Sequence, residues 1–108
     1  MKKSYHKLVR DRIPEIIERS GNSCVTRILS GEAYLPMLDE KLNEELAEYQ
    51  QSKSLEELAD LLEVMRAVVR ARGFSWEELM DACEQKRLER GGFEDRILLL
   101  EVRDGHEN

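Results

Sequence analysis

Residues 41–63 read KLNEELAEYQQSKSLEELADLLE, and the fold that we expect follows mainly from this pattern. Leucines recur in it every three or four positions, a spacing that predicts amphipathic helices on either side of a short turn. The stretch also contains two acid pairs, Glu45 with Glu48 and Glu57 with Asp60. Residues three apart lie side by side on a helix. If the two helices pack as a hairpin, these carboxylates converge.

Two interpretations of the acids remain open at this point. Carboxylates so close together repel, which favours a divalent cation between them, and all-oxygen ligation suits Mg²⁺ or Mn²⁺. The alternative is that the acids solvate exposed helix faces, and Ser54 with Glu57 also forms a good capping box. Glu57 projects onto the apolar face of its helix, between Val64 and Val68. A carboxylate there is costly unless it is paired or metal-bound.

Helical patterns cover most of the chain. We expect helices over residues 14–20, 36–49, 55–72 and 76–90. Pro36 either opens the second of these or kinks a helix begun at Ser30. The second helix carries the clearest apolar stripe, which consists of Leu35, Leu38, Leu42, Leu46 and Tyr49.

Two apolar segments, residues 24–29 and 96–102, are β-prone and are expected to pair as a minor two-stranded element. Short connections between helices favour antiparallel neighbours. The predicted fold class is therefore mainly α, an antiparallel four-helix bundle-like arrangement with this two-stranded element. A chain of 108 residues is expected to form a single domain, residues 1–108.

Charge and composition exclude several classes of function. The net charge of −6 argues against general binding to nucleic acid or anionic membranes. No apolar run approaches membrane-spanning length, and no apolar stretch follows the first residues as in a signal peptide. Cys24 and Cys83 fit no metal-binding spacing and are expected to be small buried side chains in a reduced protein. These features predict a cytoplasmic location.

The acids are concentrated in the middle of the chain, where residues 39–63 hold nine of them and two lysines. Basic residues crowd the first dozen positions and residues 86–96. Such a distribution suits a metal–polyphosphate complex, with acids on the cation and bases on phosphate oxygens. The alternative is that the basic flanks only balance the acidic middle.

The acid pairs also match a family pattern, E-x-x-E followed after a gap by E-x-x-D. Two further blocks match, YHKLVRDRIP at residues 5–14 and RGGFEDRI at residues 90–97. On these motifs the chain resembles the MazG-like all-α nucleoside triphosphate pyrophosphohydrolases, in particular their small house-cleaning branch, over about 100 residues. The superfamily is related to the phosphoribosyl-ATP pyrophosphohydrolases. The eight residues between Glu48 and Glu57 make a tight turn for this family, which leaves substrate choice open.

The resemblance implies an enzyme that hydrolyses nucleoside triphosphates, including non-standard ones, to a nucleoside monophosphate and pyrophosphate. Mg²⁺, with Mn²⁺ as a second candidate, would be held by Glu45, Glu48, Glu57 and Asp60. Water would attack the α-phosphorus, with Glu48 or Glu45 as the general base. The residues expected to bind the substrate phosphates are Lys7, Arg10, Arg12, Arg90 and Arg96.

We also expect a homo-oligomer, most simply a dimer, because the third helix is apolar around about half its circumference. The resemblance agrees with that expectation. A phosphoribosyl-ATP pyrophosphohydrolase is an enzymatic alternative, against which the two terminal blocks argue. A non-catalytic helical interaction or regulatory module is the other alternative, but such a helix has no reason to carry Glu57 on its apolar face.

Overall fold

The computed structural model describes Lys3 and residues 5–105, and these residues contain four α-helices. The helices are α1 (Ile13–Arg19), α2 (Gly31–Ser52), α3 (Leu55–Ala71) and α4 (Trp76–Arg90). The described chain divides into two units, one within residues 1–76 and one within residues 77–108. The mainly α class expected from the sequence is confirmed.

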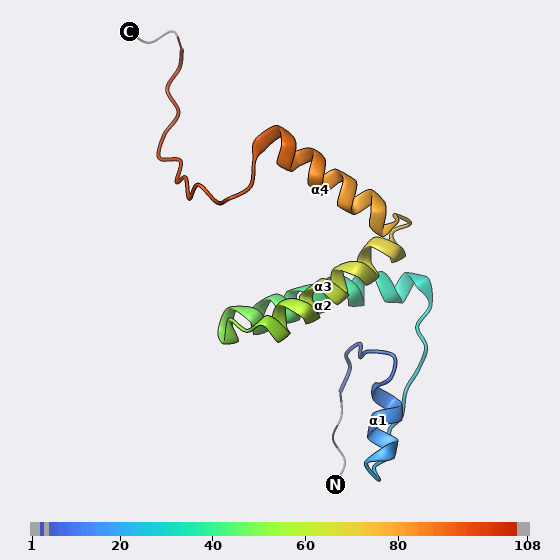
Figure 1. Cartoon of the computed structure of the whole chain (residues 1–108). Coiled ribbons are helices and arrows are strands. Elements are labelled where there is room, and N and C mark those ends of the chain that lie inside the picture. The colour runs from blue at the N-terminus through green and yellow to red at the C-terminus, as the bar shows by residue number, and fades with distance from the viewer. Residues whose placement is uncertain (1–2, 4, 106–108) are drawn as a thin grey trace. The chain divides into compact units, whose positions relative to one another are not determined.

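The first unit is built on a hairpin of α2 and α3, which lie side by side in Figure 1. Only Lys53 and Ser54 connect them, so the two helices run antiparallel. Lys53 adopts a left-handed conformation with φ of 56°, which turns the chain sharply. At the other end of the hairpin, Arg72 donates a hydrogen bond to Asp39 over 3.0 Å.

Serine side chains cap the start of both hairpin helices. Ser30 accepts a hydrogen bond from the backbone N–H of Ala33, so α2 begins at Gly31 and includes Pro36 in its interior. Ser54 accepts in the same way from the backbone N–H of Glu57, which forms one half of the predicted capping box, whereas the Ser54 N–H donates to Ser52 Oγ. Each cap satisfies a donor that has no partner inside its helix.

The buried face of the hairpin is partly apolar and partly acidic. Leu38 is 4% exposed, and Leu42, Leu61 and Val64 are half-buried. A second apolar row of α3 stays exposed, although its residues are large. That row consists of Leu55, Leu58, Leu62 and Met65. α3 therefore offers two apolar surfaces, and α2 covers one of them.

The predicted two-stranded element is not found, because neither residues 24–29 nor residues 96–102 form a strand. Most of their apolar side chains are exposed, including Val25, Ile28 and Ile97, whereas Leu29 is half-buried. β-propensity takes effect only where a half-buried surface is available to pack against, and these segments have none in their own units. The four-helix bundle stays a prediction.

The surface differs from expectation at both cysteines. Cys24 and Cys83 are free and exposed rather than buried. Within residues 3 and 5–105, no helix combines the length and the apolar character that crossing a bilayer requires. His106, whose position near the end of the chain resembles neither that of a metal ligand nor that of a general base, lies outside the described residues.

The Ser54 cap should contribute measurably to the stability of the hairpin. Replacing Ser54 with Ala removes the acceptor for the Glu57 N–H and should lower the free energy of unfolding by about 1 kcal/mol. Ser54→Asp keeps an acceptor oxygen and should retain most of the stability. Urea unfolding of the three proteins measures the difference, and equal losses in both variants would contradict the capping role.

Candidate metal centre

Three carboxylates from the two hairpin helices meet at one place. Glu45 comes from α2, while Glu57 and Asp60 come from the first two turns of α3. One oxygen of each lies within 4.8 Å of an oxygen of the others. Glu45 and Asp60 stand at similar distances from the turn, and antiparallel packing therefore brings them together. A single divalent ion can contact oxygens spaced in this way.

Two oxygens of this cluster are buried without a partner. Glu45 is 6% exposed, and its Oε2 has no hydrogen-bond partner among the described residues. Glu57 Oε2 is buried and unpartnered in the same way. Leaving such a group unsatisfied costs free energy, and more so when it is charged. These oxygens fit a hard cation such as Mg²⁺ or Mn²⁺, which takes carboxylate ligands.

Basic side chains surround the cluster and partly neutralise it. Lys41, one helical turn before Glu45, places its Nζ 3.4 Å from Glu45 Oε1. Arg10 donates a hydrogen bond of 2.6 Å to Asp60 Oδ1 from the segment before α1. No lysine or arginine forms an ion pair with Glu57 among the described residues.

Burial raises the pKa of Glu45 above its usual value, because the charged form loses its hydration. The negative charges of Glu48 and Asp60 raise this pKa further. The hydrogen bond and charge of Lys41 act in the opposite direction. Raised carboxylate pKa values are typical of functional sites in which acids crowd together.

Glu48 holds a different position from the other three predicted ligands. It is exposed, and it is not part of the group whose oxygens lie within 4.8 Å of one another. Its negative charge nevertheless contributes to the raised pKa of Glu45, which lies one turn earlier on α2. The structure thus brings together three of the four acids and leaves the fourth beside them, open to solvent.

The predicted phosphate-binding residues are divided between the units. Lys7 and Arg10 reach the acids of the hairpin, whereas Arg12 pairs with Glu15 of α1 at 3.3 Å. In the second unit, Arg90 ends α4 and Arg96 takes a left-handed conformation with φ of 57°. Phosphate binding by all five residues stays a prediction.

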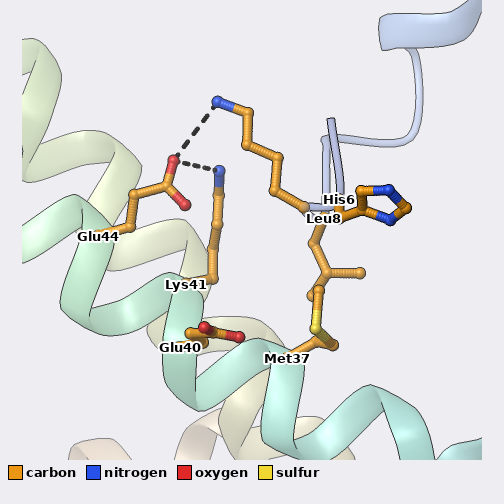
Figure 2. A pocket seen from close by; sticks show the side chains of 7 residues that line it. His6, Leu8, Met37, Glu40, Lys41 and Glu44 are labelled. Atoms are coloured by element: carbon orange, nitrogen blue, oxygen red, sulfur yellow. Dashed lines mark hydrogen bonds and ion pairs between the residues drawn. The ribbon is translucent and has the colours of Figure 1, made fainter. Parts of the chain in front are cut away.

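A pocket of about 230 Å³ lies between the segment before α1 and helix α2 (Figure 2). Leu8 and Met37 supply apolar walls, and Glu44 lies beside them with its Oε1 3.6 Å from Lys7 Nζ and 3.3 Å from Lys41 Nζ. The full lining consists of His6, Lys7, Leu8, Met37, Glu40, Lys41 and Glu44. Lys41 therefore contacts both the pocket and the cluster.

Sequence reasoning did not assign a role to Lys41 or Glu44. Lys41 precedes Glu44 by three residues and Glu45 by four, and ion pairs form at these spacings on a helix. The sequence therefore contained a signal for both ion pairs. The contact between Arg10 and Asp60 joins residues 50 positions apart, and no local pattern indicates it.

Comparisons with known proteins supply little on function. No family model matches the chain, and no solved structure matches it. A stretch of 41 residues is 58% identical to an uncharacterized protein of Mycolicibacterium smegmatis (strain ATCC 700084 / mc(2)155). That stretch is 38% of this chain and 42% of the relative.

The raised pKa of Glu45 predicts how the stability of the metal-free protein depends on pH. A carboxyl group with a raised folded-state pKa contributes stability below its unfolded pKa, and this contribution is lost as pH rises through the folded pKa. The Glu45→Gln variant has no ionisable group at this position, so it does not lose stability in this way as pH rises. The variant should be more stable than the wild type at pH 7, and the difference should shrink as pH falls.

Urea unfolding in the presence of a chelator, repeated from pH 4 to pH 8, measures this difference. Glu63→Gln is the matched control, because Glu63 is exposed and pairs with Arg66 away from the cluster. An advantage of Glu45→Gln that grows on acidification would contradict the assignment.

Proposed function

We propose that the protein is a Mg²⁺-dependent nucleoside triphosphate pyrophosphohydrolase of the MazG-like type, acting on standard or damaged nucleotides. The observation that carries this proposal is the pair of buried, unpartnered oxygens on Glu45 and Glu57 within a group of three carboxylates. Solvated acids on an exposed helix face would not produce such oxygens. The acid pairs and terminal blocks shared with that superfamily supply the reaction class.

The proposed chemistry divides tasks among the carboxylates. Glu45, Glu57 and Asp60 would hold Mg²⁺, which neutralises phosphate oxygens and lowers the pKa of bound water. Glu48 is exposed beside these ligands and is our candidate for the base that accepts the proton of the attacking water. Attack at the α-phosphorus releases a nucleoside monophosphate and intact pyrophosphate.

Basic residues of the segment before α1 would orient the substrate. Arg10 and Lys7 already lie against the acids, and this supports a role for their charges in binding a metal-bound polyphosphate. In this proposal Arg12, Arg90 and Arg96 complete the phosphate contacts. A nucleotide substrate also suggests the cytoplasm as the location.

We further propose that two copies associate through the exposed row of α3. Leu55 is 77% exposed and Leu58 is 43% exposed, although this face is apolar over several turns. Contiguous apolar surfaces of this kind usually mark protein contacts. Two hairpins joined by this face would form a four-helix bundle between two copies, which differs from the bundle within one chain that the sequence predicted. The same row is what a purely structural interaction module would use, and enzymatic activity separates the two proposals.

The proposed activity predicts both product and residue dependence. Incubation with a panel of standard and modified nucleoside triphosphates and Mg²⁺ should release pyrophosphate and monophosphate. Glu57→Gln should lower turnover at least about a hundredfold. Loss of a metal ligand should reduce activity at least as much as loss of a residue that only positions a ligand. Glu63→Gln on the same helix should keep full activity. Folding is checked by circular dichroism.

In ¹⁸O-labelled water the label should enter the monophosphate only, as attack at the α-phosphorus requires. Orthophosphate as the first product would exclude this reaction class, and full activity of Glu57→Gln would exclude the site.

The proposed dimer is tested by sedimentation at micromolar concentration. The wild type should sediment as a dimer or larger assembly, and Leu62→Glu should shift it to monomer, because a charge would then be buried in the contact. Glu63→Lys places a charge change at an exposed position of α3 outside this row and should leave the assembly intact. A monomeric wild type would overturn the proposal.

A further inference from the structure

The segment from Lys7 to Arg10 crosses both helices of the hairpin beside the acid cluster. Lys7 pairs with Glu44 of α2, and Arg10 pairs with Asp60 of α3. Between them, Leu8 is half-buried and lines the pocket with Met37. We call residues 7–10 the basic strap. It attaches to the hairpin through one apolar side chain and two ion pairs.

The strap pairs with a carboxylate that a metal ion would also need. Asp60 belongs to the three-carboxylate group, yet its Oδ1 already accepts a 2.6 Å hydrogen bond from the Arg10 guanidinium. Glu45 Oε2 and Glu57 Oε2 remain without a partner beside it. The metal-free cluster is thus partly neutralised by the strap and partly unsatisfied. A divalent cation in the cluster would repel the guanidinium at Asp60.

We propose that the basic strap is an internal competitor of the metal: a divalent cation binding to Glu45, Glu57 and Asp60 displaces Arg10 from Asp60. This inference rests on the metal site of the proposed function. The competition is reciprocal, since a strap held on Asp60 weakens metal binding by the factor by which the metal weakens the strap. The displaced guanidinium becomes available to an anion beside the ion, so metal loading precedes anion binding.

The exposure of the pair suits an exchange rather than a permanent lock. The side chains of Arg10 and Asp60 are 57% and 39% exposed. Ion pairs this open to water change an equilibrium constant by up to about fivefold. Leu8 and the contact of Lys7 with Glu44 can keep the strap nearby while Arg10 changes partner.

Titration of the metal-free protein with Mg²⁺ alone, followed calorimetrically, tests the competition. Arg10→Gln should bind Mg²⁺ about two- to fivefold more tightly than the wild type. Arg19→Gln is the matched control: it removes the same charge from an exposed arginine whose partner is Glu15, 2.7 Å away on α1. Its affinity should equal that of the wild type.

Trypsin cleavage after Arg10, followed by mass spectrometry, measures the release of the Arg10 side chain. Mg²⁺ should accelerate this cleavage in the wild type but not in Glu57→Gln, which lacks one ligand. Equal Mg²⁺ affinities of Arg10→Gln and Arg19→Gln, or weaker binding by Arg10→Gln, would contradict the proposed displacement of Arg10. The proposed metal site would not be affected by that result. Absence of Mg²⁺ binding by the wild type would overturn both.

Discussion

The packing of α2 against α3 is the interaction on which the rest of the structure depends. A connection of only Lys53 and Ser54 makes the helices antiparallel neighbours, and burial of residues such as Leu38 stabilises their contact. The same contact carries Glu45 out of solvent and places it against Glu57 and Asp60. Apolar burial over the length of the hairpin therefore offsets the unfavourable burial of carboxylates near its turn.

The protein's own cations reduce that cost without removing it. Lys41 approaches Glu45 from the preceding turn of α2, and Arg10 reaches Asp60 from a distant part of the chain. Glu57 Oε2 and Glu45 Oε2 remain unsatisfied, which leaves a place for a further positive charge. A site that is incomplete in the free protein and completed by a cation is suited to binding that cation, because the ion relieves repulsion already present.

The uncovered row of α3 follows from the same geometry. An amphipathic helix with two apolar rows can turn only one of them toward a single partner helix. Glu57 and Asp60 share the covered side with Leu61 and Val64, so the cluster and the contact with α2 are inseparable. The exposed side is thereby left without cover from α2, which is why we propose a second copy as its partner.

Much of the local structure could be predicted from the sequence because its causes are local. The Ser54 cap, the positive-φ glycines that follow helices and the apolar repeat act within a few residues of one another. The approach of Glu45 to Glu57 and Asp60 in a hairpin also followed from helical spacing and a short turn. The strands predicted from β-propensity at residues 24–29 and 96–102 are not found. A strand needs a partly buried surface to pack against, and no local sequence pattern specifies that surface.

Only the tertiary structure decided the state of each carboxylate. Helical spacing treats Glu45 and Glu48 as equals, yet packing buries the first and leaves the second in solvent. It likewise brings Arg10 to Asp60 across 50 residues, which no periodicity encodes. The sequence by itself determined which residues form helices and which faces are acidic. Burial and long-range charge pairing depend on how those faces meet in space, and for that reason they emerged only from the folded chain.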